Sequence, residues 1–293
     1  MTVWNLGSIN ADHVYRLPRL PLAGETLGAA SLAHGLGGKG ANMSVALARA
    51  GADARHIGAV GADGAWMVER LRSYGVGTDA VATVEGPSGH AIILVDDAAE
   101  NLIVTHAGAN ARIEPAAVAR ALDAAAPGDW FLTQNETAAQ ADSAALARLR
   151  GLSVAYAAAP FAPDAVRAVL PHLSLLVLNA VEAEQLRAAT GEGVGALGLA
   201  HVLVTLGAEG CLWLHEGREW RFAAPRVEAV DTTGAGDTFT GFALALLDEG
   251  REMPEAVALA QKAAALKVTR AGAADAIPAR AEAERFGEAP EAG

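Results

Sequence analysis

Short apolar runs alternate with longer alanine-rich runs along most of the chain. The short runs are almost continuously apolar, which is typical of parallel strands buried on both faces. They lie at 2–6, 55–60, 130–133, 153–156, 175–178 and 202–205. The alanine-rich runs predict helices at 41–50, 65–74, 115–125, 142–150, 181–190, 237–249 and 254–269. This alternation predicts an α/β fold in which helices cover both faces of a largely parallel sheet.

The last of these helices has the clearest buried stripe. Apolar residues recur at i, i+3 and i+4 spacing through 256, 257, 260, 263, 264 and 268. Gln261 and Lys262 fall on other faces of the helix. We therefore expect the stripe to pack on the sheet, with these two polar residues away from it.

Two regions break the alternation, at about 14–32 and 90–105, because each predicts two β runs joined by a turn. In the second region, residues 96–100 form a polar loop of the hairpin type. We expect the two regions to pair as a small β lid on a body that spans residues 1–278. Residues 279–293 predict a short helix that frays into a disordered end.

Composition and charge exclude several classes of protein. With 52% hydrophobic and 19% charged residues, the chain of 293 residues can bury a core, which excludes an intrinsically disordered protein. The net charge of −12 without a run of Lys or Arg disfavours binding to nucleic acid. Cys211 is the only cysteine, the start lacks a positively charged leader, and no apolar run suits a membrane span. These features predict a cytoplasmic protein without membrane association.

A glycine-rich segment at 35–42 precedes the first predicted helix and satisfies G-x-G-x-x-G. It does not follow the first strand directly, as a dinucleotide fingerprint does, and Lys39 is followed by Gly40 rather than by Ser or Thr, which excludes a Walker A loop. One interpretation is a flexible turn that enters the helix. The other is a ligand site, because Lys39 and Asn42 are polar groups placed where glycines let a ligand approach the backbone.

A second glycine-containing segment, 231–238, leads into the predicted helix 237–249. Small residues at a helix N-terminus leave N–H groups free, and these groups and the helix dipole favour a phosphoryl group. Asp237 would then lie beside the transferring phosphate and accept a proton from an attacking hydroxyl. The alternative is that Asp237 simply caps the helix or complements its dipole.

Two polar pairs follow predicted strands. Asn10 and Asp12 are two residues apart, so in an extended chain both point the same way and match adjacent hydroxyls of a polyol, although a solvated turn is the alternative. Asn179 and Glu182 follow the strand 175–178, where Glu182 could organise water molecules on Mg²⁺. The alternative for this pair is a helix cap with an acid at its third position.

Taken in order, four motifs resemble those of the ribokinase-like (PfkB) sugar kinases. They are Gly7-Ser8-Ile9-Asn10-Ala11-Asp12, Gly37-Gly38-Lys39-Gly40-Ala41-Asn42, Asn179-x-x-Glu182 and Asp231-Thr232-Thr233-Gly234-Ala235-Gly236-Asp237. The resemblance runs from about Leu6 to Pro278, and it is greatest to the members that act on D-ribose. It implies a three-layer α/β/α body with a small β lid that also forms the contact of a homodimer.

The resemblance assigns roles to individual residues. For the sugar it implies Asn10, Asp12, Gly38, Lys39, Asn42 and Glu136, and for general base catalysis Asp237. For the backbone anion hole it implies Gly234, Ala235 and Gly236, and for ATP Asn179, Thr205, Gly207, Gly210 and Gly236. For Mg²⁺ through water it implies Glu182, and for K⁺ Asp231, the carbonyl of Thr233 and backbone groups near Arg270 and Gly272.

The implied reaction is transfer of the γ-phosphate of ATP to the primary hydroxyl of a small sugar, D-ribose above all. Alternatives are a kinase for deoxyribose, fructose or a nucleoside, a non-catalytic sensor on this fold, and, last, a dinucleotide-dependent dehydrogenase. The sequence also departs from the family pattern. Ala276 stands where Ser is usual and Gln261 where Asn or His is frequent, and 186–201 is about ten residues shorter, which predicts a stunted or missing helix.

Overall fold

The computed structural model describes residues 1–98 and 100–287, and within these residues the strands form two sheets. The large sheet contains, in spatial order, β13 (Arg218–Phe222), β12 (Cys211–His215), β11 (His201–Thr205), β10 (Leu175–Asn179), β9 (Ser153–Ala157), β8 (Trp130–Gln134), β1 (Thr2–Leu6), β4 (Asp53–Val60) and β5 (Gly77–Thr83). All neighbours from β11 to β5 are parallel, whereas β12 and β13 are antiparallel.

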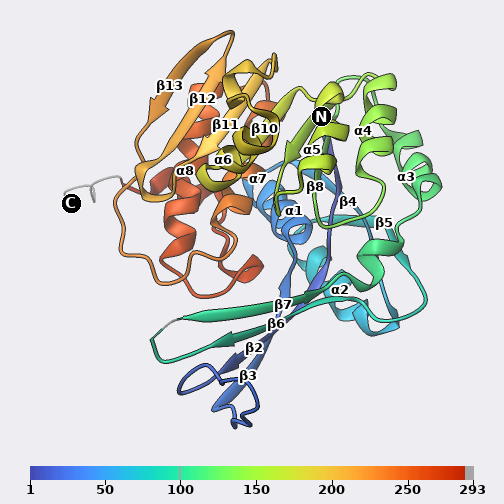
Figure 1. The fold of residues 1–293 in the computed structure, drawn as a ribbon. Helices are drawn as coiled ribbons and strands as arrows, with labels where there is room; N and C mark the ends of the chain where they lie inside the picture. Colours follow the sequence, from blue (N-terminus) through green and yellow to red (C-terminus); the bar gives the residue numbers. More distant parts are fainter. Residues whose placement is uncertain (99, 288–293) are drawn as a thin grey trace, which may run out of the picture.

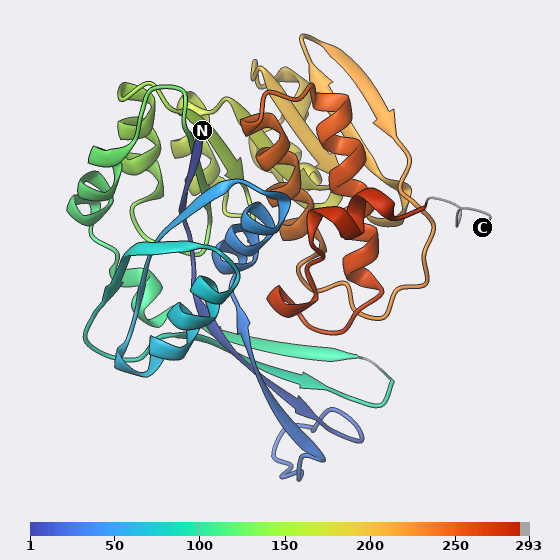
Figure 2. The same ribbon diagram turned by 180° about the vertical axis from the view of Figure 1, so that it is seen from behind.

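Helices cover both faces of the large sheet, so the predicted three-layer architecture is confirmed (Figures 1 and 2). One face packs against α1 (Lys39–Ala50), α2 (Ala65–Ser73), α7 (Ala235–Asp248), α8 (Met253–Val268) and α9 (Arg280–Arg285). The other packs against α3 (Pro115–Ala121), α4 (Gln140–Leu149), α5 (Pro163–Val169) and α6 (Ala180–Thr190). The two apolar clusters lie on opposite faces because successive strand residues point to opposite sides.

All strands and helices that the alternation predicts are present, with bounds shifted by a few residues. The helix predicted at 115–125 ends earlier, because α3 stops at Ala121 and a 3₁₀ turn follows at Leu122–Ala124. The shortened segment 186–201 indeed lacks a further α-helix, since a 3₁₀ turn at Val194–Ala196 leads to β11. The pattern did not predict β5, β12, β13 or the seven-residue α5.

The small sheet has the order β3 (Ser31–Gly37), β2 (Asn10–Arg16), β6 (Gly89–Val95) and β7 (Asn101–His106) within the described residues. It projects from one end of the body, as Figure 1 shows. Its strands extend beyond the predicted 14–32 and 90–105, so Gly35 and Gly37 lie in β3 rather than in a turn. The polar loop 96–100 lies between β6 and β7, and residue 99 lies outside the described residues.

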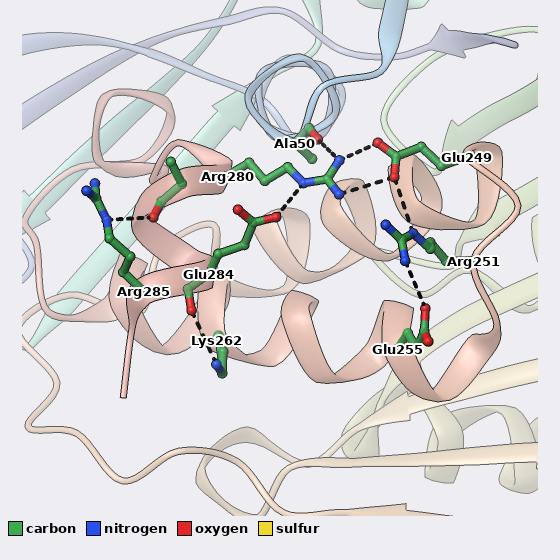
Figure 3. A network of polar contacts seen from close by, with 9 residues as sticks. Ala50, Glu249, Arg251, Glu255, Lys262, Arg280, Glu284 and Arg285 are labelled. Atoms are coloured by element: carbon green, nitrogen blue, oxygen red, sulfur yellow. Dashed lines mark hydrogen bonds and ion pairs between the residues drawn. The ribbon is translucent and has the colours of Figure 1, made fainter. Parts of the chain in front are cut away.

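The C-terminal helix α9 is tied to the body by charged side chains (Figure 3). Arg280 pairs with Glu249 at the end of α7 and with Glu284 on α9, and it also donates to the carbonyl of Ala50. Ala283 on the same helix is fully buried. The predicted short helix after residue 279 is therefore present, and the expected disordered end at 288–293 lies outside the described residues.

The buried face of α8 differs from the prediction. Gln261 is buried rather than on an outer face, and its amide donates to the carbonyl of Phe222 at 3.4 Å. Lys267 is also buried, which the apolar stripe alone did not indicate. Both residues face segments that pack over α8 from distant parts of the chain. In the described part of the chain, no helix is long and apolar enough to cross a membrane.

Candidate active site

The predicted site residues come from one edge of the large sheet and from the root of the small sheet. Chain segments that leave β1, β8 and β10 at their carboxyl ends carry Ser8, Glu136 and Asn179. The N-terminal turns of α1 and α7 carry Lys39 and Asp237. In open α/β sheets, ligand-binding groups gather at this edge because the carboxyl ends of parallel strands meet there.

Asp237 lies in the first turn of α7 and is only 8% exposed. Its carboxylate accepts a hydrogen bond of 2.8 Å from the side-chain amide of Asn42 on α1. The N-cap of α7 is Gly234, with φ of +73°, and no side chain caps the helix. Asp237 therefore does not cap the helix, although its place in the first turn still complements the helix dipole. Burial raises the pKa of Asp237, and the nearby Lys39 ammonium opposes that rise.

Lys39 and Glu136 form the second part of the site. The charge of Asp237 raises the pKa of Lys39, so the ammonium remains protonated. The Nζ atom lies 4.0 Å from Glu136 Oε1. Glu136 is held in place, because its Oε2 accepts from the Lys39 backbone N–H at 3.0 Å and from Ser8 Oγ at 2.6 Å. The region thus holds fixed carboxylates around one ammonium group.

Asn10 and Asp12 lie on β2, so the interpretation of this pair as a solvated turn is wrong. Burial, and then the charge of Glu136, raises the pKa of Asp12 to about 7. Asn10 is buried, and its side-chain oxygen accepts from Asn110 Nδ2 at 2.8 Å. Asn110 also accepts from the N–H of Ile9 at 3.0 Å, which fixes the root of the small sheet.

A buried polar network supports the start of α1 from below. Asn5 Nδ2 donates to the carbonyl of Gly40 and to Ser44 Oγ, each at 2.8 Å. The ring of His56 lies between Ser44 Oγ at 2.8 Å and the carbonyl of Gly7 at 3.0 Å. Burial lowers the pKa of His56 to about 4, so the ring is neutral at physiological pH. The network positions the glycine-rich turn and does not face the proposed ligands.

Asn179 and Glu182 form a reciprocal cap at the start of α6. Asn179 Oδ1 accepts from the Glu182 N–H, and Glu182 Oε2 accepts from the Asn179 N–H, both at 2.8 Å. The capping interpretation is confirmed. Burial raises the pKa of Glu182, while the Asn179 N–H and the Lys39 charge oppose that rise. The Glu182 carboxylate is therefore close enough to Lys39 to interact with its charge.

The segment predicted for the nucleotide follows β11, the strand beside β10. Thr205 is paired in register with Asn179, so both lie at the same sheet edge. A 3₁₀ turn at Gly207–Glu209 and then Gly210 connect β11 to β12. These residues lie along the edge from Asp237 and have no direct side-chain contact with it among the described hydrogen bonds.

Asp231 begins the loop that leads into α7, and its carboxylate is held by two backbone N–H groups. Oδ1 accepts from Thr233 and Oδ2 accepts from Gly272, each at 2.9 Å. Lys267 Nζ donates to the carbonyl of Asp231 at 2.8 Å. Arg270 directs its guanidinium away to Glu282 on α9 at 2.6 Å, which leaves only its backbone for a ligand at this loop.

The structure brings several of the predicted sugar and phosphate residues together. Asn42 donates to Asp237, and Glu136 accepts from the Lys39 backbone N–H and lies near its ammonium. The charge of Glu136 also acts on Asp12.

The sequence reasoning did not assign roles to Ser8, Asn110 or Lys267. Ser8 lies inside the first motif that resembles the family, so that motif was the available signal, whereas Asn110 lies outside the four motifs. Lys267 had no such signal, because a lysine near a helix end is usually exposed.

Comparisons with known proteins show which family the chain resembles. The model of the pfkB family carbohydrate kinase matches residues 2–280. The ribokinase of Haemophilus influenzae is 36% identical over 301 residues, which cover 97% of this chain and 98% of that protein. The crystal structure of the Thermotoga maritima ribokinase has a TM-score of 0.86 and 30% identity, with 98% and 99% of the two chains covered.

A third comparison includes ligands. The structure of the Arabidopsis thaliana ribokinase complexed with ribose and ATP has a TM-score of 0.86 and 28% identity, and it covers 97% of this chain and 98% of that one. The family model spans nearly the whole chain, from residue 2 to residue 280. The chain belongs to the pfkB family of carbohydrate kinases.

Proposed function

We propose that this protein transfers the γ-phosphate of ATP to the primary hydroxyl of D-ribose, giving ribose 5-phosphate and ADP. The observation that carries the proposal is the buried carboxylate of Asp237 at the N-terminus of α7, hydrogen bonded to Asn42 and near the Lys39 ammonium. The similarity to ribokinases over nearly the full chain favours ribose among the sugars.

In the proposed reaction, Asp237 takes the proton of the sugar hydroxyl while the hydroxyl oxygen attacks the γ-phosphorus. The bond to the bridging β–γ oxygen breaks, and ADP leaves. Backbone N–H groups of Gly234, Ala235 and Gly236, with the dipole of α7, stabilise the charge on the phosphoryl oxygens. Asn42 and Lys39 orient the Asp237 carboxylate and favour its ionised form, which opposes the effect of burial on its pKa.

We propose that the sugar lies between the small sheet and the body, with 1–278 as one kinase domain and the small sheet as its lid. The polar groups offered to the hydroxyls are those of Asn10, Asp12, Gly38, Lys39, Asn42 and Glu136. Carboxylates and amides accept and donate hydrogen bonds as vicinal hydroxyls require. The pocket around them decides between ribose and related sugars.

A coupled measurement of ADP release tests the proposed activity. Purified protein with MgATP is offered ribose, deoxyribose, fructose and several nucleosides, and ribose is expected to give the highest kcat/KM. A higher kcat/KM for a nucleoside would assign another substrate class within the same chemistry. Absence of turnover with every acceptor, in protein that still binds ATP and ribose, would instead favour a sensor on this fold.

The raised pKa of Asp12 predicts a pH-dependent affinity for the sugar. With a pKa of about 7, the group is mainly ionised at pH 8 and mainly protonated at pH 6. A sugar hydroxyl donates to the ionised form, so KM for ribose should rise about tenfold from pH 8 to pH 6. Initial rates at a series of ribose concentrations and pH values measure this change.

Two variants identify the group that titrates. Asp12→Asn should remove the pH dependence of KM, and Glu136→Gln should move its midpoint to lower pH because a repelling charge is lost. If the pH dependence of KM in Asp12→Asn still has its midpoint near 7, Asp12 is not the group that titrates.

The same pKa also affects stability. Since folding raises the pKa of Asp12 above its ordinary value of 3.8, ionisation of Asp12 makes the fold less stable as pH rises from about 4 to 7.

We propose that ATP lies along Asn179, Thr205, Gly207 and Gly210, with its γ-phosphate at Gly236. Mg²⁺ is usually bound by one or two carboxylates together with substrate phosphates and water, and it neutralises phosphate charge when bound. Glu182 fits such a role through water, because its carboxylate is half-buried and near Lys39 and Asp237.

Glu182→Gln removes the negative charge of this side chain and keeps its hydrogen bond in the cap of α6. Glutamine retains the hydrogen bond to the Asn179 N–H, so the unfolding temperature should change little. The Mg²⁺ concentration for half-maximal activity should rise about tenfold or more, since an anionic partner is lost. Glu184→Gln on the same helix, which removes an exposed pair with Arg187, is the matched control. An unchanged Mg²⁺ requirement would exclude Glu182 as a contact of the metal shell.

K⁺ as an activator is predicted beside the loop 231–236, where the buried ammonium of Lys267 already lies near the Asp231 carboxylate. The carboxylate of Asp231 and the carbonyl of Thr233 are oxygen donors, which suit a hard monovalent cation, and N–H groups of Thr233 and Gly272 fix that carboxylate. Backbone groups near Arg270 and Gly272 complete the proposed donor set. Bound there, K⁺ would add positive charge near the anion hole.

We also propose a homodimer formed through the small sheet, in the cytoplasm. The whole of β7 is exposed, with Leu102, Ile103 and Val104 at 46%, 52% and 58% exposure. A second copy of this chain would cover that apolar strand. Light scattering is expected to give twice the mass of one chain, and a single-chain mass at micromolar concentration would overturn the dimer.

A further inference from the structure

Lys267 is a buried charged side chain that the proposed reaction does not yet use. It lies in the last turn of α8 and has no exposed surface. Its Nζ donates to the backbone carbonyl of Asp231 at 2.8 Å and lies 4.0 Å from the Asp231 carboxylate. A lysine is almost never fully buried without a partner, so this position requires an explanation.

The partner of Lys267 is the loop that forms the proposed anion hole. The loop runs from Asp231 to Gly236 and enters α7 directly. The N–H groups of Val230 and Asp231 donate to the carbonyl of Val268 at 2.7 and 3.0 Å, next to Lys267 in the chain. The start of the loop is therefore fastened to the end of α8 by backbone bonds, and Lys267 adds a charged contact.

The ammonium also acts on the site electrostatically. Burial lowers the pKa of Lys267, and the negative charges of Asp231 and Asp237 oppose that change by stabilising the protonated form. In the other direction, the Lys267 charge favours the ionised forms of Asp231 and Asp237. One buried positive charge thus connects the start of the loop with the proposed base at its end.

We propose that Lys267 is a positioning residue for phosphoryl transfer, whose buried ammonium serves as an internal cation for the loop 231–236 and greatly reduces the benefit of external K⁺. This inference rests on the proposed kinase function. The ammonium carries the same charge as K⁺ and binds the same kind of oxygen atom. It is also held permanently by the chain, so no ion has to be recruited from solution.

The carboxylate of Asp231 gives the physical reason. A cation that binds there from solution meets the Lys267 charge 4.0 Å from the same carboxylate, and the two like charges repel. Without Lys267, the repulsion is absent and the loop carbonyl loses its charged donor. Removal of the lysine should therefore loosen the loop and improve the site for K⁺ at the same time.

The test compares Lys267→Met with Lys262→Met. Methionine has a similar length and no charge, and Lys262 lies on the same helix with its Nζ near the carbonyl of Glu284. In buffers whose only other cation is tetramethylammonium, Lys267→Met should have a kcat about tenfold or more below wild type, with KM for ribose within about threefold. Addition of K⁺ should restore most of this loss, whereas wild type and Lys262→Met should change less than about twofold.

A second readout does not depend on turnover. K⁺ should raise the unfolding temperature of Lys267→Met and should leave that of wild type and Lys262→Met nearly unchanged, since only the first has a vacant place for a cation. If no sugar is phosphorylated by wild type, the proposed function fails, while this K⁺-dependent difference still tests the internal cation.

Several results would overturn the inference. Strong activation of wild type by K⁺, or a large K⁺-dependent rise in its unfolding temperature, would mean that Lys267 does not replace the ion. A loss in Lys267→Met that K⁺ does not restore would assign Lys267 a merely structural role. If Lys267→Met does not fold, K⁺ titrations of wild type decide the question. The inference requires that K⁺ change neither the activity nor the unfolding temperature of wild type by much.

Discussion

Replacement of Asp237 by asparagine is expected to lower kcat by roughly 10²- to 10⁴-fold while KM for ribose changes less than about threefold. Asparagine has nearly the same shape but accepts no proton. It should still contact Asn42, so the start of α1 and the sugar pocket remain in place. The loss therefore falls on the chemical step, and steady-state kinetics at saturating ATP measure it.

The stability of the variant separates a catalytic from a structural role. Burial raises the pKa of Asp237 above its unfolded value, so the ionised group makes the fold less stable as pH rises above that unfolded pKa. Asp237→Asn should consequently unfold at the same or a higher temperature at pH 7. Asp248→Asn, which changes a buried acid at the other end of α7, is the control and should retain kcat. If Asp237→Asn turns over at the wild-type rate, Asp237 is not the base.

Replacement of Gly40 by alanine is expected to lower the free energy of unfolding by about 3 kcal/mol or more. A Cβ atom at this position would overlap the backbone of Gly7 and Ser8, and backbone atoms cannot move aside as a flexible side chain does. The same shift would displace Ser8, which donates to Glu136. Denaturant unfolding measures the stability, and KM for ribose should rise as well.

Gly35→Ala is the matched control because it changes a glycine of the same G-x-G-x-x-G segment. Gly35 lies in β3, and no atom lies within 4 Å of the place where its Cβ would be. Its effect should stay within about 0.5 kcal/mol. If both variants lose the same stability, the close approach of α1 to the end of β1 is not what requires a glycine at residue 40.

The elements that the sequence did not predict have specific physical causes. The hairpin of β12 and β13 has a usable signal, since Glu216 and Gly217 separate two short runs and β12 starts with four apolar residues. The second run is mostly polar, because β13 lies at the edge of the sheet. The helix α5 has seven residues, too few for a 3.6-residue period to become distinct. The strand β5 is polar on one side because it lies at the sheet edge.

Within the site, the local motifs predict contacts with ligands, and the structure shows how the side chains of these residues are held. Asn179 and Glu182 show the limit of such reasoning. Their three-residue spacing is compatible with both a cap and a metal contact, and only the coordinates reveal the reciprocal hydrogen bonds. For Asp237 the coordinates exclude one alternative, because it lies inside α7 without a capping bond, and they retain the other, a favourable interaction with the helix dipole.

The sequence by itself determined the α/β class and the order of most elements, and it predicts the chemistry of the two glycine-containing segments, because these follow from local periodicity and from residue types next to each other. Tertiary structure decided which distant groups share a charge environment. Asn42 meets Asp237 across 195 positions, and Lys267 is buried only because the segment at Asp231 folds back over the end of α8. Hydrogen bonds and Coulomb energies depend on distance in space, and a local pattern contains no information about that distance.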